Sequence, residues 1–229
     1  MFQTLVSQQP AFLKRLVQLS ISQLKTDLLP KPERLIEVAG EIFAVRGFSA
    51  TVREICKAAN CSVAAINYYF GDKQHLYFRC VQAACEEKER LFPLPNYAEA
   101  TRPAERLQRF VEVMTRRILA AKNQSWQSTL LLREVLSPTP GVEEMLRAHF
   151  RPGFALLSQI IGELLGAANS HELRDQMAWQ IVARCMFLRT GRHLRVMLSE
   201  IPITDQTATE QACEICNSVL SQIENLNNP

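Results

Sequence analysis

The chain has 229 residues, of which 47% are hydrophobic and 21% charged, and its formal net charge is +3. These values are typical of a folded protein with one large or two modest domains, and they exclude a collagen-like, low-complexity or globally disordered chain. The charge is unevenly distributed: residues 1–79 carry ten Lys and Arg against six Asp and Glu, whereas residues 80–229 carry sixteen against seventeen. We therefore expect a polyanion to bind to the N-terminal part.

Cysteine content and targeting signals predict the compartment. No stretch of the sequence reaches the ~18 uncharged apolar residues that a transmembrane helix needs. The N-terminus also lacks the basic patch and apolar run of a secretory signal. The seven cysteines are an odd number, so we expect reduced thiols rather than a disulfide framework. These observations predict a cytoplasmic protein.

Apolar residues recur at helical spacing along almost the whole chain, which predicts an all-α fold. The first segment, residues 1–30, is an N-terminal extension whose apolar residues can line one helical face. Three roles are open for it: a helix that packs on the first domain, a basic arm that follows DNA through Lys14, Arg15 and Lys25, or a mobile tail. We favour packing.

Three short helices are predicted in the next domain, residues 31–90, which includes a connecting helix. An apolar stripe that begins at Leu35 ends at Gly47, a natural helix C-cap. Residues 51–54, Thr-Val-Arg-Glu, form a capping box that starts the next helix. Asn60 tolerates the left-handed conformation that ends it, and Ser62 caps a short helix two residues later. A longer helix, capped by Asp72, then runs toward Arg90.

A capped helix, a tight turn and a short second helix are the parts of a helix-turn-helix. Small side chains at the start of the second helix, Val63, Ala64 and Ala65, let it enter a major groove, and Asn67 one turn later can bond adenine N6 and N7. A solvent-facing Asn67 without a base contact is the alternative. Candidate phosphate donors are the Thr51 and Ser62 hydroxyls, Arg53, Tyr68, Tyr69 and Lys73.

Residues 31–79, and above all 51–73, closely resemble the N-terminal domain of TetR-family transcriptional regulators. Asn60 and Cys61 depart from the usual Gly-Val of the family, and Asn67 stands where a phosphate-contacting Tyr is common. The resemblance implies a homodimer in which the last two helices pair with those of the partner in a four-helix bundle. It also implies that the variable middle helices enclose a small-molecule pocket coupled to the DNA-binding heads.

The remaining residues, 91–229, are expected to form the ligand-binding and dimerisation domain after a proline-containing linker at 91–96. A helix over 171–198 is apolar around so much of its circumference that it needs two packing partners. The other predicted helices start at Pro103 and cover about Trp126–Leu136, Val142–Leu165 with a kink or split near Pro152, and about Gln206–Leu226.

Residues 132–140 and 150–152 resemble the effector domain of the subgroup that includes CecR, which does not determine a ligand. Core packing is the alternative role for each apolar candidate. Arg133 beside Glu134 forms a structural ion pair, bonds a helix end, or is part of a site for an anionic effector. The candidate effector-binding residues are the aromatic and ionic groups on apolar helices: Trp126, Arg133, Glu134, His149, Phe150, Phe154, Met186, Phe187 and Arg189.

Other function classes have weaker support. Cys213 and Cys216 have the spacing of a zinc-site fragment, but no second pair accompanies them. Cys56 and Cys61 flank the turn of the DNA head, where oxidation would disturb docking, yet only Lys57 is near enough to lower a thiol pKa. The sequence lacks the common catalytic motifs. We therefore expect no metal, cofactor or enzymatic activity, and predict a repressor that a small-molecule effector releases from a palindromic operator.

Overall fold

A computed structural model of the chain describes residues 31–97, 102–119, 125–166, 170–199 and 205–227. These residues form helices and no strand, so the predicted all-α fold is confirmed. The chain divides into two compact units, one ending at Cys80 and the other beginning at Val81. The roles considered for the extension, residues 1–30, lie outside the described residues. No described helix has the length and apolar content to cross a membrane.

The first unit is a small helical domain. Its elements are α2 (Pro32–Arg46), the 3-10 turn η1 (Gly47–Ser49), α3 (Val52–Ala59), α4 (Val63–Phe70) and the start of α5 (Lys73–Leu91). The Tyr77 ring is completely buried and makes edge contacts with Phe43 and Phe48, at centroid distances of 4.7 Å and 5.2 Å. This aromatic cluster packs the start of α5 against α2 and η1. Apolar side chains from every helix complete the core, namely Leu35, Ala39, Ile55, Ala59, Ile66 and Leu76.

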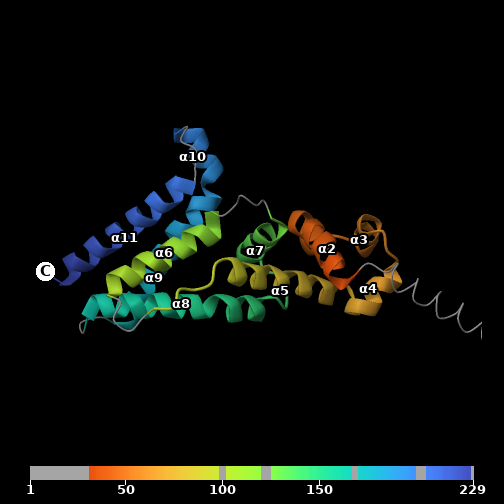
Figure 1. The fold of residues 1–229 in the computed structure, drawn as a ribbon, viewed down its shortest axis with the longest axis horizontal. Coiled ribbons are helices and arrows are strands. Elements are labelled where there is room, and N and C mark those ends of the chain that lie inside the picture. The colour runs from red at the N-terminus through yellow and green to blue at the C-terminus, as the bar shows by residue number, and fades with distance from the viewer. Residues whose placement is uncertain (1–30, 98–101, 120–124, 167–169, 200–204, 228–229) are drawn as a thin grey trace, which may run out of the picture. The chain divides into compact units, whose positions relative to one another are not determined.

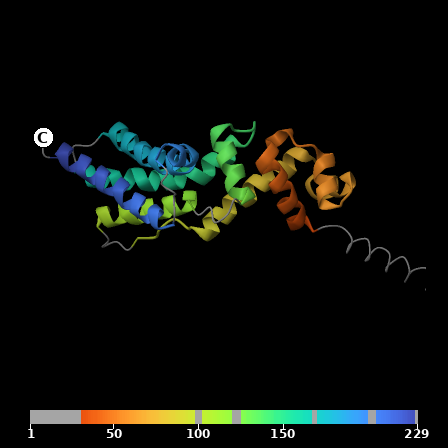
Figure 2. The ribbon, with the colours of Figure 1, turned by 90° about the horizontal axis from the view of Figure 1, so that it is seen from above.

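The described residues of the second unit form the rest of α5 and six further helices. Four of them, α6, α8, α9 and α11, lie side by side and enclose the main core (Figures 1 and 2). The α9 helix buries Met177, Ala178, Ile181 and Cys185 in this core, which agrees with the need for more than one packing partner. The six helices are α6 (Pro103–Leu119), α7 (Trp126–Leu136), α8 (Glu143–Leu165), α9 (His171–Thr190), α10 (Arg192–Ser199) and α11 (Asp205–Asn227).

The structure decides one open alternative and corrects one expected helix. Of the kink or split expected near Pro152, the split does not occur: α8 continues through Pro152, because the buried residues Leu146 and Leu157 hold the turns on both sides and one missing backbone donor does not end the helix. The single helix expected over 171–198 is instead broken at Gly191 into α9 and α10. A Cβ at Gly191 would lie 2.8 Å from the Phe187 carbonyl oxygen, so this turn needs glycine for its close approach.

Candidate nucleic-acid interface and effector cavity

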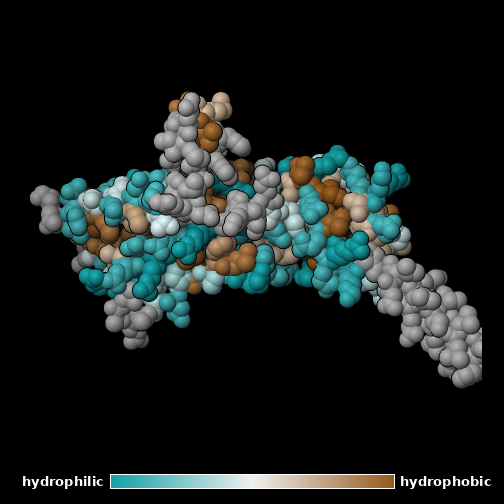
Figure 3. Space-filling view, turned by 45° about the horizontal axis from the view of Figure 1, so that its top comes forward, coloured by the Kyte–Doolittle hydropathy of each residue, from teal (hydrophilic) through white to brown (hydrophobic). Residues whose placement is uncertain are grey.

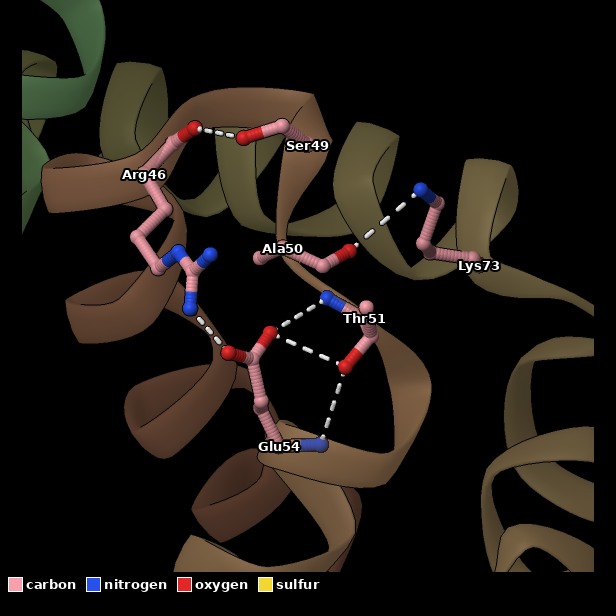
Figure 4. Close-up of polar contacts among 6 residues, drawn as sticks. All are labelled: Arg46, Ser49, Ala50, Thr51, Glu54 and Lys73. Carbon is pink, nitrogen blue, oxygen red and sulfur yellow. Dashed lines mark hydrogen bonds and ion pairs between the residues drawn. The ribbon is translucent and has the colours of Figure 1, made fainter.

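The start of α3 is held by the predicted capping box (Figure 4). The Thr51 hydroxyl accepts a hydrogen bond from the Glu54 N–H at 3.3 Å, and the Glu54 carboxylate accepts from the Thr51 N–H at 2.8 Å. The same carboxylate pairs with Arg46. The bonds from Thr51, followed by the Arg46 charge, lower the pKa of Glu54 below its ordinary value. The Thr51 hydroxyl also donates to the Glu54 carboxylate at 2.9 Å, so a phosphate contact by this hydroxyl would replace that bond.

The turn between α3 and α4 has the predicted geometry. Asn60 has φ 51° and ψ 51°, the left-handed conformation, and closes α3. The Cys61 N–H then donates to the Cys56 carbonyl at 3.0 Å. The Ser62 hydroxyl accepts from the Ala65 N–H at 3.3 Å and caps α4. These local bonds fix α4 relative to α3 within the first unit.

One face of α4 is exposed and holds most of the proposed base-reading residues. Val63 is 45% and Tyr68 78% exposed, and Ala64 and Asn67 are exposed beside them on the same side of the helix. Ala65, which we included among the groove-facing residues, is only 3% exposed because it packs into the core. It cannot touch a thymine methyl without unfolding α4, so we remove it from the reading surface.

The candidate phosphate donors differ in availability. Arg53 is exposed in the first turn of α3, and Tyr69 is half-buried. Lys73 points inward: its Nζ donates to the Ala50 carbonyl at 3.3 Å (Figure 4). It also donates to the Phe48 carbonyl at 2.8 Å and lies 4.0 Å from the Phe48 ring centroid. Two of the three ammonium protons are thus used inside the unit. Lys73 fastens the loop before α3 to α5, a structural role that the sequence pattern did not indicate.

The cysteines do not favour the sensor or metal alternatives. All seven are free thiols. Burial and the neighbouring Cys56 raise the pKa of Cys61 to about 11, which keeps its thiol protonated at neutral pH. Burial likewise raises the pKa of Cys216 to about 12. Within the described part of the chain, no group of three His, Cys, Asp or Glu is placed to hold a metal ion.

A cavity of about 630 Å³ lies inside the second unit. Six of the predicted effector-binding residues line it: Glu134, His149, Phe150, Phe154, Met186 and Arg189. Most of its wall is apolar and comes from α6, α7, α8 and α9. These apolar residues include Phe110, Met114, Ile118, Leu131, Leu132, Leu146, Leu157, Trp179 and Val182.

Three predicted effector-binding residues lie outside this cavity. Trp126 is 7% exposed but does not reach the cavity wall, and Arg133 and Phe187 are exposed. Successive helix residues point about 100° apart, so the neighbours Glu134 and Met186 face inward while Arg133 and Phe187 face outward. Sequence proximity on α7 and α9 was therefore a poor guide to which ionic or aromatic side chain lines the cavity.

The buried carboxylate in the cavity wall already has protein partners. Glu134 is fully buried, and its oxygens accept from the Thr139 N–H at 2.8 Å and the Thr139 hydroxyl at 2.9 Å. It thus anchors the segment that follows α7. This contact favours the structural alternative, a bond near a helix end, over direct recognition of a ligand by Glu134.

Sequence reasoning missed two cations that line the cavity, Lys88 on α5 and Arg117 on α6. The Lys88 Nζ donates to the Arg117 carbonyl at 3.1 Å, and the Arg117 Nε donates to the Phe92 carbonyl at 2.6 Å. Burial, followed by the charges of Arg189 and Arg117, lowers the pKa of Lys88 to about 8. Both residues lie among other charged residues in the sequence, so no local pattern distinguished them.

A second polar contact joins α5 to the cavity wall. The His149 Nδ1 on α8 lies 2.8 Å from the Glu89 Oε1 on α5. Burial lowers the pKa of His149 below its ordinary value and outweighs the hydrogen bond to Glu89, which raises it. The segment of α5 at 88–89 is thus tied by side chains both to α6 and to α8.

Comparison with known families agrees with this arrangement. Residues 35–80 match the model of bacterial regulatory proteins of the tetR family. Residues 103–224, more than half of the chain, match the C-terminal domain of the HTH-type transcriptional dual regulator CecR. The chain belongs to the TetR family. It is a DNA-binding transcriptional regulator with a CecR-like C-terminal domain, and the predicted resemblance is confirmed.

One relative supports the TetR-family assignment, and two solved structures share the fold. The chain is 30% identical over 179 residues to the CecR protein of Shigella flexneri, a match that covers 69% of this chain and 79% of that protein. A tetR-family protein from Rhodococcus RHA1 shares the fold with a TM-score of 0.61, 17% identity and coverage of 85% and 97%. AibR, solved with isovaleryl coenzyme A and operator DNA, has a TM-score of 0.60, 14% identity and coverage of 84% and 97%.

Family membership also decides between function classes. TetR-family proteins are transcriptional regulators rather than enzymes. They bind operator DNA and small-molecule effectors and function as dimers. The helix-turn-helix of the first unit is therefore the DNA-binding element of this TetR-family regulator.

Proposed function

We propose that this protein is a homodimeric repressor that a small-molecule effector releases from a palindromic operator. The exposed face of α4, formed by Val63, Ala64, Asn67 and Tyr68, carries the DNA part of the proposal. It offers one amide and small apolar groups to base edges in the major groove. Arg53, Ser62 and Tyr69 supply phosphate contacts around it. Two such heads would dock in successive major grooves, and the protein would work in the bacterial cytoplasm.

The cavity in the second unit is the proposed effector site. Its volume suits a small molecule, and its apolar wall with a few polar groups is typical of ligand pockets. The α5 helix runs from Lys73, which anchors the loop before α3, to Lys88 in the cavity wall. We expect an effector to act through α5. It shifts the population toward a state that does not bind the operator only if it binds that state more tightly.

The proposed homodimer uses the last helices of the second unit. Trp179 and Phe187 on α9 are 60% and 61% exposed, and Met197 and Leu198 on α10 are 78% and 75% exposed. The hydrophobic residues of α10 are visible at the surface at the top of Figure 3. Exposed apolar groups of this size mark interaction surfaces. We propose that α9 and α11, with α10 beside them, pair with the same helices of a second copy.

The test is a titration of the purified protein against DNA from upstream of its own gene and against random DNA, at two salt concentrations. Sequence-selective binding by a dimer, weakening steeply with salt, supports the proposal. If the upstream DNA shows no preference, selection of bound genomic fragments follows. Failure to enrich any fragment from the genome would contradict the operator-binding role.

Two substitutions separate base reading from phosphate contact. Asn67→Ala should reduce affinity for the operator by about 5- to 100-fold and leave random DNA unchanged, because it removes a base contact. Arg53→Gln should weaken both DNAs about equally and reduce the salt slope by about one. Fluorescence anisotropy at several salt concentrations measures both effects. Equal losses on the two DNAs for Asn67→Ala would contradict its base-reading role.

A further inference from the structure

Three cations from three helices meet in the wall of the cavity. Lys88 comes from α5, Arg117 from α6 and Arg189 from α9. Lys88 and Arg117 are in direct contact, because the Lys88 Nζ bonds the Arg117 carbonyl at 3.1 Å. The charges of Arg117 and Arg189 also disfavour the protonated form of Lys88, so both arginines lie within electrostatic reach of Lys88. Like charges gathered in a partly desolvated site repel one another.

The cluster is not neutralised by the carboxylates of the cavity. Including Arg147 and Arg151, five cations line the cavity, against the two carboxylates of Glu134 and Glu143. Each of these carboxylates accepts a hydrogen bond from a backbone N–H in the segment 139–141. Arg147 has its own partner, Glu144, at 3.3 Å. The cavity thus has an excess of positive charge that its own acidic groups do not balance.

The donors of the cluster are only partly used. Lys88 donates one of its three ammonium protons to the Arg117 carbonyl, and Arg117 donates its Nε–H to the Phe92 carbonyl. Within the described ranges no acceptor is bonded to the two terminal nitrogens of Arg117, which leaves them for another acceptor. Among the described residues, no carboxylate pairs with Arg189. The bonds to carbonyls explain why Lys88 and Arg117 are held in place, but they supply no negative charge.

The carboxylates beside Lys88 on α5 have partners of their own. Glu87, whose charge favours protonated Lys88, pairs with Arg90 at 2.8 Å. Glu89 contacts His149: its Oε1 lies 2.8 Å from the His149 Nδ1, and its side chain is 59% exposed. Glu89 favours the charged form of Arg117, but it does not line the cavity. An anion inside the cavity would therefore meet the three cations without displacing a protein carboxylate from them.

We propose that the effector is an amphipathic anion. Its aromatic or branched aliphatic body fills the apolar part of the cavity, and its single carboxylate, sulfonate or phosphate group accepts hydrogen bonds from Lys88, Arg117 and Arg189. Charge-assisted hydrogen bonds to such a group are stronger than neutral ones, and the half-buried positions of the three cations reduce their competition with water. This inference rests on the proposed function, in which the cavity is the effector site.

The test compares two fluorescent probes that share one ring system. Anilinonaphthalene sulfonate carries a sulfonate, and N-phenylnaphthylamine is the same aromatic body without it. We expect the full-length protein to bind the sulfonate at least about ten-fold more tightly, from the hydrogen bonds to a charged group. Arg189→Gln and Lys88→Gln should each remove most of this difference while the affinity for N-phenylnaphthylamine stays the same. Melting curves monitored by circular dichroism verify that each variant is folded.

Two control variants distinguish a failure of the anion inference from a failure of the proposed effector site. Arg116→Gln removes an exposed arginine next to Arg117 that does not line the cavity, and it should change neither affinity. Val182→Trp fills the cavity and should abolish binding of both probes. If both probes bind equally and Val182→Trp blocks both, the anion inference is overturned but the effector cavity stands. If Val182→Trp blocks neither probe, this inference is overturned together with the proposed effector site.

Discussion

At the residue scale, Asn60 carries the turn of the DNA-binding head in a conformation that few side chains tolerate. It is the single residue other than glycine with positive φ in the described part of the chain. Asn60→Ala should lower the free energy of unfolding by about 1–2 kcal/mol, because alanine lacks the short polar side chain whose local hydrogen bonding lets asparagine tolerate the left-handed region. Asn60→Gly should change it by less than about 0.5 kcal/mol, because glycine adopts that region without strain. Chemical denaturation measures both, and equal effects of the two substitutions would contradict the role of φ.

The half-buried charge of Lys88 lowers the free energy of unfolding. The pKa of Lys88 falls from 10.5 in the unfolded chain to about 8 in the folded protein. Between these two pH values the unfolded chain binds more protons, so the free energy of unfolding should rise with pH across that window. Below pH 8 Lys88 is protonated in both the folded and the unfolded state, so the free energy of unfolding is lowered by the full penalty of burying its charge.

Lys88→Met should therefore stabilise the protein at pH 7, by about 1–3 kcal/mol. The rise in stability between pH 8 and 10.5 should also become smaller. Thermal unfolding at a series of pH values measures both effects, with Lys57→Met as a control at an exposed position. A variant that is less stable than the wild-type protein at pH 7 would show that the bond to the Arg117 carbonyl outweighs the cost of burial.

At the scale of elements, substitutions at two glycines test why the chain breaks between α9 and α10 but continues through α8. Gly191 lies at the break between α9 and α10, where a Cβ would lie 2.8 Å from the Phe187 carbonyl oxygen and 2.7 Å from its ring. Gly153 lies inside α8, where a Cβ would meet Leu94 at an ordinary 3.6 Å. Gly191→Ala should lower stability by about 1–3 kcal/mol through overpacking. Gly153→Ala should raise it by about 0.5–1 kcal/mol through helix propensity.

The opposite signs of these two effects are the critical observation. Thermal unfolding of both variants, together with the far-ultraviolet circular dichroism spectrum, measures them. If Gly191→Ala were as stable as the wild-type protein, the break would depend on something other than the close approach to Phe187.

At the scale of the whole molecule, the proposed dimer depends on the exposed apolar side chains of the second unit. Phe187→Glu should convert dimer into monomer and reduce operator affinity, because it places a charge in the proposed interface. Leu136→Glu introduces the same charge at a comparably exposed site, 66% against 61%, outside the proposed interface. It should leave the dimer intact. Light scattering coupled to size-exclusion chromatography reports the mass, and a dimeric Phe187→Glu variant would exclude Phe187 from the interface.

Local signals predicted most of the DNA-binding head. Capping at Thr51 and Ser62, and the left-handed turn at Asn60, depend on side chains that bond backbone groups within three residues, so the sequence records them directly. The start of α6 at Pro103 was predicted because proline suits the first turn of a helix, and the extent of α7 was predicted from apolar residues at helical spacing, which are also local signals. The break at Gly191 was missed because it depends on a close approach to the Phe187 side chain and carbonyl, which helical periodicity does not reveal.

By itself, the sequence determined the all-helical fold, the helix-turn-helix and membership of the TetR family, because periodicity, caps and a long motif are local properties of the chain. Only the tertiary structure decided which side chains face inward. It buried Ala65, turned Lys73 toward the carbonyls before α3, and separated Glu134 from its neighbour Arg133. It also brought Lys88 to Arg117, 29 positions away, beside one cavity. Such contacts between helices depend on how the helices pack, and the spacing of residues along the chain does not specify that packing.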